Sequence, residues 1–305
     1  MLFDSNSLLA YSSAAFHATS QNFFSQRLRL HYVEWGSRNN PTIVLVHGIH
    51  DHCRTWDDIV ERIGGYADDY HIVAPDLRGH GDSEWVKGSG YQYLDYVYDL
   101  YQLIDQNDFG PVVLVGHSLG GAIVSLFAGV YPEMVSKLIV IEGIGLWSLS
   151  KPPQSTVEKI REWSDATRAL AGRSPKRYGN LEQAYQRMQQ ANPQLSKDKA
   201  FHLTLHGAIQ QEDGRFSWKY DNYTYNFSAT GLSIDETISL WQNIACPILL
   251  INATEGLEWR TGQNGSLEHF ADVQLLDVSD AGHWTHHDQP EVVASMMREF
   301  IEALK

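Results

Sequence analysis

The sequence is poor in cysteine. Only Cys53 and Cys246 are present among 305 residues, far apart in the chain and without a C-x-x-C spacing. A disulfide framework or a thiolate metal site needs more cysteines than these two, or cysteines closer together. We therefore expect both residues to be reduced and to behave as small buried side chains.

Basic charge and long apolar runs are also scarce. The chain has 23 Lys and Arg against 37 Asp and Glu, which gives a net charge of −14. Nucleic acid is not expected as a partner, because cationic side chains dominate binding to a phosphate backbone. No run approaches the roughly 20 apolar residues of a membrane span, and segment 1–20 lacks the basic start and apolar core of a signal peptide. The sequence predicts a cytoplasmic protein without membrane contact.

Short apolar runs alternate with stretches of helical periodicity along most of the chain. Residues 28–36 alternate like an edge strand. Buried-strand patterns occupy 42–46, 71–74, 137–141, 247–251, 273–278 and the run that begins at Pro111. Helical spacing recurs in 91–106, 120–130 and 290–304. This order predicts an α/β fold whose mostly parallel sheet is covered by helices on both faces.

The pattern changes between residues 147 and 235. Strand signals disappear, polar helical stretches such as 181–190 replace them, and aromatic residues cluster in 216–227. We expect a helical cap here, inserted after the strand that ends at Glu142, with the core domain formed by 1–146 and 236–305. A cap at this position is well placed to cover a site at the carboxyl ends of the strands.

The most informative motif is Gly116-His-Ser118-Leu-Gly120, which follows an apolar strand. A strand that turns at once into a helix holds the residue at the turn in a strained conformation, and side chains two positions away would collide there. Glycine at 116 and 120 fits this requirement. The turn would expose the serine hydroxyl and direct the first helix amides toward an oxyanion. We therefore expect Ser118 to be a nucleophile.

A serine hydroxyl needs a histidine base near neutral pH, and the histidine needs an acid that holds its tautomer. Among the 14 histidines, His283 stands out because it follows strand 273–278 in the loop Asp-Ala-Gly-His-Trp. The glycine in this loop permits a sharp turn at the end of the strand. We expect His283 to be the base.

The other histidines near these motifs are expected to have structural roles. His47 would brace a loop, His117 would be structural, and His286 and His287 would form a solvated or capping pair. The segment 47–52 (HGIHDH) is similar to a metal-binding pattern of three histidines and an aspartate, but its spacing departs from H-x-H-x-D-H. We expect neither a metal site nor a cofactor.

Four motifs together carry a family resemblance. They are His47-Gly48 at the end of a strand, the loop 76–83 (DLRGHGDS), the turn 116–121 (GHSLGG) and Gly282-His283. With these motifs in this order, the chain resembles the α/β-hydrolase fold family. The stretch 214–221 (GRFSWKYD) is similar to caps of its epoxide-hydrolase-like and serine-hydrolase-like branch.

The resemblance implies further site residues. The backbone amides of Ile49 and Leu119 would form the oxyanion hole. Dehalogenases and epoxide hydrolases of this fold have aspartate where this chain has Ser118, so the resemblance does not extend to their chemistry.

The triad acid departs from the family pattern. Most relatives place an aspartate shortly after the strand that corresponds to 247–251, and here Gly256 stands at that position. A minority take the acid from the end of the preceding sheet strand, where this chain has Glu142. A carboxylate at the end of a buried strand is costly unless it is paired. Glu142 is therefore the favoured acid, with Glu255 and then Glu258 as alternatives, and a structural strand-end carboxylate remains a further interpretation.

These residues favour a serine hydrolase that cleaves a small-molecule ester, thioester or lactone through an acyl-enzyme on Ser118. The aromatic cap would suit a substrate with a hydrophobic or aromatic portion. Two alternatives stay open: a serine-triad hydrolase of carbon–carbon bonds, and a non-catalytic small-molecule receptor of the same fold. The sequence leaves the oligomeric state open.

Overall fold

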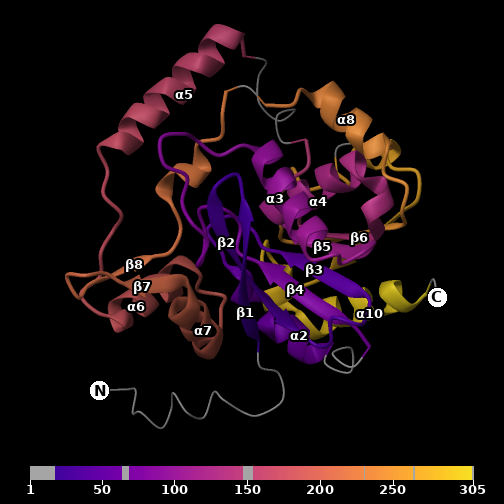
Figure 1. Cartoon of the computed structure of the whole chain (residues 1–305), viewed down its shortest axis with the longest axis horizontal. Helices are drawn as coiled ribbons and strands as arrows, with labels where there is room; N and C mark the ends of the chain where they lie inside the picture. The colour runs from indigo at the N-terminus through magenta and orange to yellow at the C-terminus, as the bar shows by residue number, and fades with distance from the viewer. Residues whose placement is uncertain (1–17, 64–68, 147–153, 230, 264, 304–305) are drawn as a thin grey trace.

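The protein is built around one eight-stranded sheet. The computed structural model describes residues 18–63, 69–146, 154–229, 231–263 and 265–303. The sheet order is β1-β2-β4-β3-β5-β6-β9-β10. Its strands are β1 (Thr19–Ser25), β2 (Leu28–Trp35), β3 (Thr42–Val46), β4 (His71–Pro75), β5 (Val112–His117), β6 (Val135–Ile141), β9 (Ile248–Ala253) and β10 (Val273–Val278). Strand β2 pairs antiparallel with β1 and β4, and the remaining neighbours are parallel (Figure 1).

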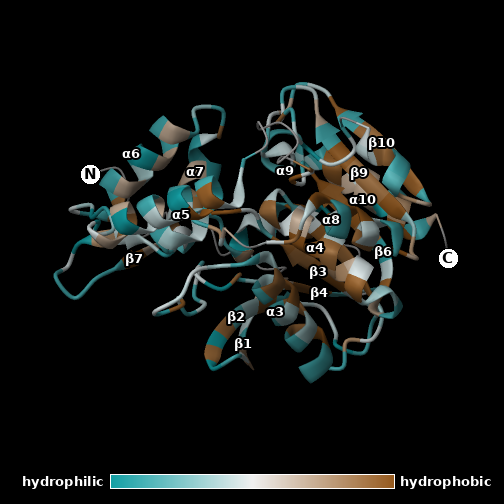
Figure 2. Ribbon diagram, turned by 90° about the horizontal axis from the view of Figure 1, so that it is seen from above, coloured by the Kyte–Doolittle hydropathy of each residue, from teal (hydrophilic) through white to brown (hydrophobic). Residues whose placement is uncertain are grey.

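The central strands are buried on both faces, as their continuous apolar runs predict. In β3 the side chains of Val44 and Val46 belong to one hydrophobic cluster, whereas those of Ile43 and Leu45 belong to a second cluster on the opposite face. Figure 2 shows the sheet as the most hydrophobic part of the molecule. The expected mostly parallel sheet is confirmed.

One strand assignment is wrong. Strand β2 was expected at the edge of the sheet, but β1 pairs along its outer side in a register that joins Phe23 to Leu30. The sequence of β1 is largely polar, and only two of its seven residues are buried. An exposed edge strand of this kind carries little hydrophobic periodicity, so the sequence gives no signal for it.

Helices cover both faces of the sheet. One face carries α3 (Tyr93–Gln106), α4 (Leu119–Val130) and α8 (Ile234–Gln242), and the other carries α2 (Asp57–Arg62) and α10 (Pro290–Glu302), which follows the short α9 (Thr285–Asp288). Residue 304, the predicted end of the last helix, lies outside the described residues. Among the helices that the structure describes, none has the length and apolar character needed to cross a bilayer.

The cap segment contains α5 (Thr156–Ala171), α6 (Leu181–Ala191), α7 (Lys197–Gly207) and the two-stranded hairpin β7 (Ala208–Gln210) and β8 (Phe216–Trp218). The helices agree with the predicted helical insertion. The hairpin does not, because strands of three residues are too short to show a period. Residues 147–153, where the cap was expected to begin, lie outside the described residues. Helix α8 starts at Ile234 and packs on α4, so the predicted return to the core at 236 falls in its first turn.

The cap is tied to the core close to the predicted active site. The backbone N–H of Asp221 donates to the Gly79 carbonyl at 2.8 Å, and the Tyr91 hydroxyl donates to the Asp221 carboxylate at 2.8 Å. On α7, the carbonyl of Leu203 accepts a hydrogen bond from Nε2 of His52 at 3.0 Å. These contacts fix the cap over the carboxyl ends of the strands (Figure 1).

Candidate active site

Ser118 stands at the sharp turn between β5 and α4. Its backbone has φ 52° and ψ −115°, a strained conformation for a residue that bears a side chain. A Cβ added to Gly116 would come within 2.4 Å of the Gly120 carbonyl oxygen, so the turn closes only with glycine at position 116. The sequence interpretation of this motif as a strained strand-to-helix turn is confirmed.

Ser118 and His283 meet across the carboxyl edge of the sheet. The Ser118 hydroxyl lies 2.8 Å from Nε2 of His283, within hydrogen-bonding distance. His283 comes from the loop after β10, and its side chain is 21% exposed, whereas Ser118 is buried. The structure thus joins two residues that are 165 positions apart in the sequence.

Glu142 lies on the other side of the imidazole. Its Oε2 is 3.4 Å from Nδ1 of His283, and the carboxylate is fully buried. The backbone N–H groups of Ala253 and Leu257 donate to it at 2.6 and 3.0 Å. The Nε of Arg260 lies 3.2 Å from Oε1. A buried carboxylate fixed by these partners can hold the His283 tautomer.

The alternative acids lie elsewhere. Glu255 and Glu258 are both exposed. The backbone N–H of Glu255 donates a hydrogen bond to the Ala281 carbonyl at 3.0 Å. Glu142 is therefore the carboxylate that the structure brings to His283. Arg260, the cationic partner of Glu142, was not identified from the sequence, because its place in a loop after β9 gives no pattern that points to Glu142.

The turn after β3 lies against the serine. A Cβ added to Gly48 would be 3.2 Å from Cβ of Ser118, so the segment that carries the Ile49 amide lies directly beside the hydroxyl. Leu119 is the first residue of α4, and the first amides of a helix have no intrahelical acceptor. Both amides predicted to form the oxyanion hole are therefore next to Ser118 in space or sequence.

Comparison with known proteins agrees with this arrangement. The family model described as "Alpha/beta hydrolase family" matches residues 43–296, most of the chain. The chain belongs to the alpha/beta hydrolase family. This membership confirms the resemblance derived from the four motifs, and it supports a hydrolase.

Individual members of the alpha/beta hydrolase family are similar at low identity. A serine hydrolase-like protein of Danio rerio is 25% identical over 276 residues, covering 88% of this chain and 83% of the relative. Epoxide hydrolase 4 of Mus musculus is 26% identical over 294 residues, covering 90% of this chain and 77% of the relative. The solved thioesterase domain from the curacin biosynthetic pathway superposes with a TM-score of 0.77 at 21% identity, covering 92% of this chain and 99% of that domain. The superposition on the thioesterase domain shows that the two chains share a fold.

Gly256 occupies the position at which most members of the alpha/beta hydrolase family were expected to carry the acid. A Cβ added to Gly256 would lie 2.2 Å from Oε2 of Glu142. The Glu142 carboxylate thus fills the space that a side chain at 256 would enter. The two positions compete for one volume beside His283.

This competition predicts that the acid can be moved. Glu142→Ala should lower kcat/KM for a nitrophenyl ester by about 10³-fold, because His283 loses its carboxylate. Adding Gly256→Asp to that variant should raise kcat/KM again by at least about tenfold, because the new carboxylate can occupy the space that the Glu142 side chain has left. Gly256→Asp alone should be poorly active because the two carboxylates clash. The matched control is Glu142→Ala with Gly256→Asn, and equal activity of the Asp and Asn double variants would contradict the prediction.

His47 and His117 have the structural positions expected of them. Nδ1 of His47 donates to the Gly48 carbonyl at 2.6 Å, and its Nε2 accepts the Leu77 N–H at 3.0 Å. Nε2 of His117 donates to the His283 carbonyl at 2.7 Å. Burial lowers the pKa of both imidazoles, so they are neutral braces of the loops around Ser118.

The prediction for His286 and His287 is wrong. His286 is fully buried and stacks on Trp56 with ring centroids 4.8 Å apart. Burial lowers the pKa of both histidines well below the ordinary value. The cause is tertiary: α9 packs beneath the cap-facing loops, where Thr55 Oγ1 meets Nε2 of His287 at 2.9 Å. Two adjacent histidines in a sequence do not indicate that other segments will bury them.

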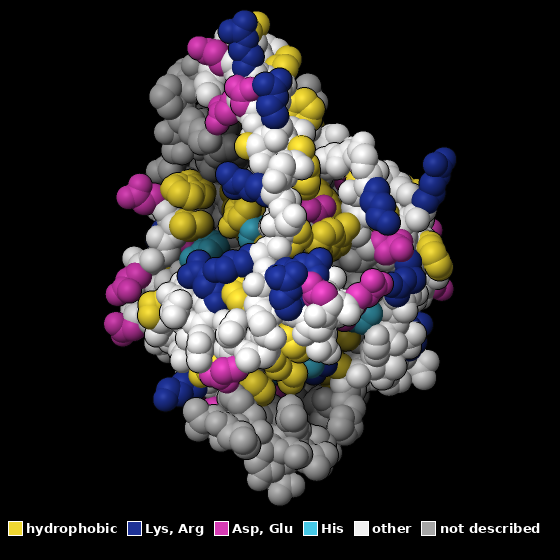
Figure 3. Space-filling view, turned by 90° about the vertical axis from the view of Figure 1, so that its left-hand side faces the viewer, with side chains coloured by type: hydrophobic (Ala, Val, Ile, Leu, Met, Phe, Trp, Pro, Cys, Tyr) yellow, Lys and Arg dark blue, Asp and Glu magenta, His cyan; other side chains and the backbone are white. Residues whose placement is uncertain are grey.

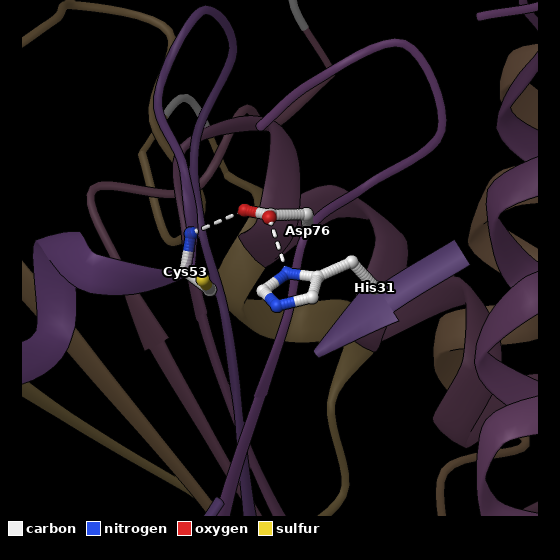
Figure 4. A group of neighbouring side chains, drawn as sticks. All are labelled: His31, Cys53 and Asp76. Atoms are coloured by element: carbon white, nitrogen blue, oxygen red, sulfur yellow. Dashed lines mark hydrogen bonds and ion pairs between the residues drawn. The ribbon is translucent and has the colours of Figure 1, made fainter. Parts of the chain in front are cut away.

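The loop 76–83 is anchored by a second buried carboxylate, that of Asp76 (Figure 4). Nδ1 of His31 donates to it at 2.7 Å, and the backbone N–H of Cys53 donates at 2.7 Å. Burial alone would raise the pKa of Asp76, but the hydrogen bond and charge of His31 outweigh it and hold that pKa low. Burial also raises the pKa of the Cys53 thiol, so Cys53 is a protonated, buried cysteine, as expected. This group fixes the loop, because both oxygens of the Asp76 carboxylate accept hydrogen bonds from described residues.

Aromatic residues of the cap lie against the turn after β3. His50 stacks on Tyr220 with centroids 3.8 Å apart and meets Tyr225 edge-on at 4.1 Å. Burial lowers the pKa of His50 to about 4, so this contact is uncharged at neutral pH. Figure 3 looks onto the cap side and shows hydrophobic and histidine side chains together near the middle of that face. The cap therefore brings apolar surface to the site.

Proposed function

We propose that the protein is a serine hydrolase that cleaves a small-molecule ester, thioester or lactone through an acyl-enzyme on Ser118. The observation that carries this proposal is the 2.8 Å contact between the Ser118 hydroxyl and Nε2 of His283 at a strained turn. A nucleophile within hydrogen-bond reach of its base, with the base held by a third group, is the signature of covalent catalysis by serine.

The proposed reaction begins with proton transfer. His283 accepts the Ser118 proton through Nε2 as the serine oxygen attacks the carbonyl carbon. Glu142 keeps the proton of the neutral imidazole on Nδ1 and stabilises the imidazolium that forms. The 3.4 Å separation of Glu142 and His283 is at the long end of hydrogen bonding, and such contacts tighten when substrate binds.

The oxyanion of the tetrahedral intermediate would be held by the backbone amides of Ile49 and Leu119. Backbone donors that are fixed before substrate arrives stabilise the developing charge without reorganisation. His283 then donates its proton to the leaving oxygen or sulfur. Water, deprotonated by the same histidine, attacks the acyl-enzyme and releases the acid.

Uncharged aromatic surface near the site supports the proposed substrate class. Tyr220 and Tyr225 pack around a neutral His50 on the turn that carries the Ile49 amide. An uncharged aromatic wall favours a substrate with a hydrophobic or aromatic portion. Similarity to a serine hydrolase-like protein and to a thioesterase domain supports this class. The cytoplasmic location expected from the sequence remains a prediction.

Activity-based labelling tests the proposal directly. Wild type and Ser118→Ala are treated with an organofluorophosphonate and digested for mass spectrometry, beside assays of nitrophenyl esters of increasing chain length. We expect one adduct on the peptide containing Ser118, together with ester turnover. A folded wild type with neither adduct nor turnover would contradict the proposal and favour a receptor-like member of the fold.

A further inference from the structure

Asp51, His117 and His286 come together beside the candidate triad from three separate segments. Asp51 follows the turn after β3, His117 ends β5 and His286 lies in α9. One potential ligand atom of each residue lies within 4.8 Å of the corresponding atoms of the other two. The His117 and His286 rings meet edge to face with centroids 4.6 Å apart.

The His117 tautomer is set by its hydrogen bond. A carbonyl oxygen is only an acceptor, so Nε2 of His117 carries the proton that it shares with the His283 carbonyl. Nδ1 of His117 therefore presents a lone pair, and this buried atom has no hydrogen-bond partner among the described residues.

His286 presents a second free ring nitrogen. Its Nε2 lies 3.5 Å from the Thr55 hydroxyl, while Nδ1 is buried and unpartnered within the described chain. A histidine that binds a metal through one ring nitrogen commonly has a polar group at the other, as His286 has in Thr55.

Asp51 supplies negative charge to the same group. One carboxylate oxygen, Oδ1, accepts the His52 backbone N–H at 2.9 Å. The other, Oδ2, is buried and makes no hydrogen bond to the residues described. Two imidazoles and a carboxylate, each with a buried polar atom that has no partner among the described residues, thus lie close together. Such a group is unfavourable by itself and is satisfied by a cation.

We propose that Asp51, His117 and His286 form a binding site for a divalent transition-metal ion of the zinc class, next to the catalytic residues. Zn²⁺ binds both imidazole nitrogen and carboxylate oxygen, at about 2.0–2.2 Å. Mg²⁺ and Ca²⁺ prefer all-oxygen sites, so they are excluded as occupants. Three protein ligands leave a fourth position for water or an exogenous ligand. The proposal departs from the sequence-based expectation that the chain has no metal site.

Two other groups of possible ligands lack these properties. The carboxylate of Asp76 is already saturated by His31 and backbone amides. Near the surface, Asp57 is paired with Arg54, and His202 donates to the Arg54 carbonyl at 3.0 Å. His206 completes this second group and serves as a control position.

The proposed ion would connect the parts of the active site. Asp51 belongs to the segment that carries the Ile49 amide, His117 precedes Ser118, and His117 also holds the His283 carbonyl. A metal on Nδ1 makes the opposite N–H of an imidazole a stronger donor. Binding would therefore tighten the link between the nucleophile strand and the loop of the base, and would do so whether or not the protein hydrolyses esters.

Metal binding to the full-length protein tests the site without using activity. Protein freed of metal by a chelator and then dialysed is titrated calorimetrically with Zn²⁺, and with Co²⁺ under an absorption spectrometer. We expect one equivalent of each ion, a visible Co²⁺ spectrum of low coordination number, and no heat with Mg²⁺. At a free Zn²⁺ concentration about 100 times Kd, the melting temperature should rise by about 5 °C.

Three variants locate the binding. Asp51→Asn and His286→Gln should each weaken Zn²⁺ binding by at least about 100-fold and abolish the thermal shift. His206→Gln, in the surface group, should bind as the wild type does. Circular dichroism verifies that each variant is folded, and Asp51→Asn, at a partly exposed position, keeps the test valid if His286→Gln does not fold. Absence of a stoichiometric site in wild type, or loss of binding in His206→Gln instead, would overturn the proposal.

Discussion

Ser118→Ala is expected to lower kcat for ester hydrolysis by about 10⁵-fold, because the turn 116–121 (GHSLGG) has no second side-chain hydroxyl that could attack the substrate. Residual hydrolysis should come from binding and from the Ile49 and Leu119 amides alone. The substitution removes one oxygen atom and leaves the strained backbone as it is, so the melting temperature should change little. Steady-state kinetics on the best nitrophenyl ester, corrected for uncatalysed hydrolysis, measure the effect.

Ser125 offers a matched control for this experiment. It is also a buried serine of the same segment, and its hydroxyl donates to the Gly121 carbonyl within α4 at 2.7 Å. Ser125→Ala should leave kcat within about twofold, since it touches neither Ser118 nor His283. Retention of more than about one hundredth of wild-type kcat in Ser118→Ala would remove the serine from the mechanism.

Glu142→Gln is expected to have the second largest effect, a loss of about 10³ to 10⁴ in kcat/KM. The neutral amide cannot stabilise an imidazolium on His283. In the wild type, the backbone N–H groups of Ala253 and Leu257 each donate to one oxygen of the Glu142 carboxylate. In the variant, the amide NH₂ group would replace one of these oxygens, so one N–H donor would face another donor. The same burial that makes the charge effective also makes the substitution destabilising, so thermal unfolding is measured beside the kinetics.

The competing acids provide the control. Glu255→Gln and Glu258→Gln change exposed carboxylates and should alter kcat/KM by no more than about threefold. A larger loss in Glu255→Gln than in Glu142→Gln would move the acid to the loop after β9. A loss of stability in Glu142→Gln with unchanged kcat/KM would make Glu142 a structural carboxylate only.

The parts of the site that depend on local sequence could be predicted. The turn at Ser118 is specified by its two glycines, and the position of His283 by a strand followed by a glycine-containing loop. Glu142 could be inferred because a charge at the end of an apolar strand requires a partner. The central strands were found because burial on both faces produces continuous apolar runs.

Features that depend on packing between distant segments could not be predicted. Strand β1 is too polar to show a period, and the burial of His286 results from the cover that neighbouring segments provide. Arg260 reaches Glu142 only because the loop after β9 folds back over it. The group of Asp51, His117 and His286 joins three segments whose spacing in the chain has no relation to their distance in space.

The position of Glu142 before the cap divides the candidate triad unevenly along the chain. Ser118 and Glu142 belong to one continuous strand-helix-strand unit, β5-α4-β6, while His283 is on the far side of the insertion. The two halves are joined within the sheet by β6 and β9, which pair from Leu138 with Ile248 to Ile141 with Ile251. A cut in the cap would therefore yield an amino-terminal fragment that carries nucleophile and acid and a carboxy-terminal fragment that carries the base. Reassociation of such fragments along this pair of strands would bring His283 back to Ser118, so the chain is suited to complementation of a split enzyme.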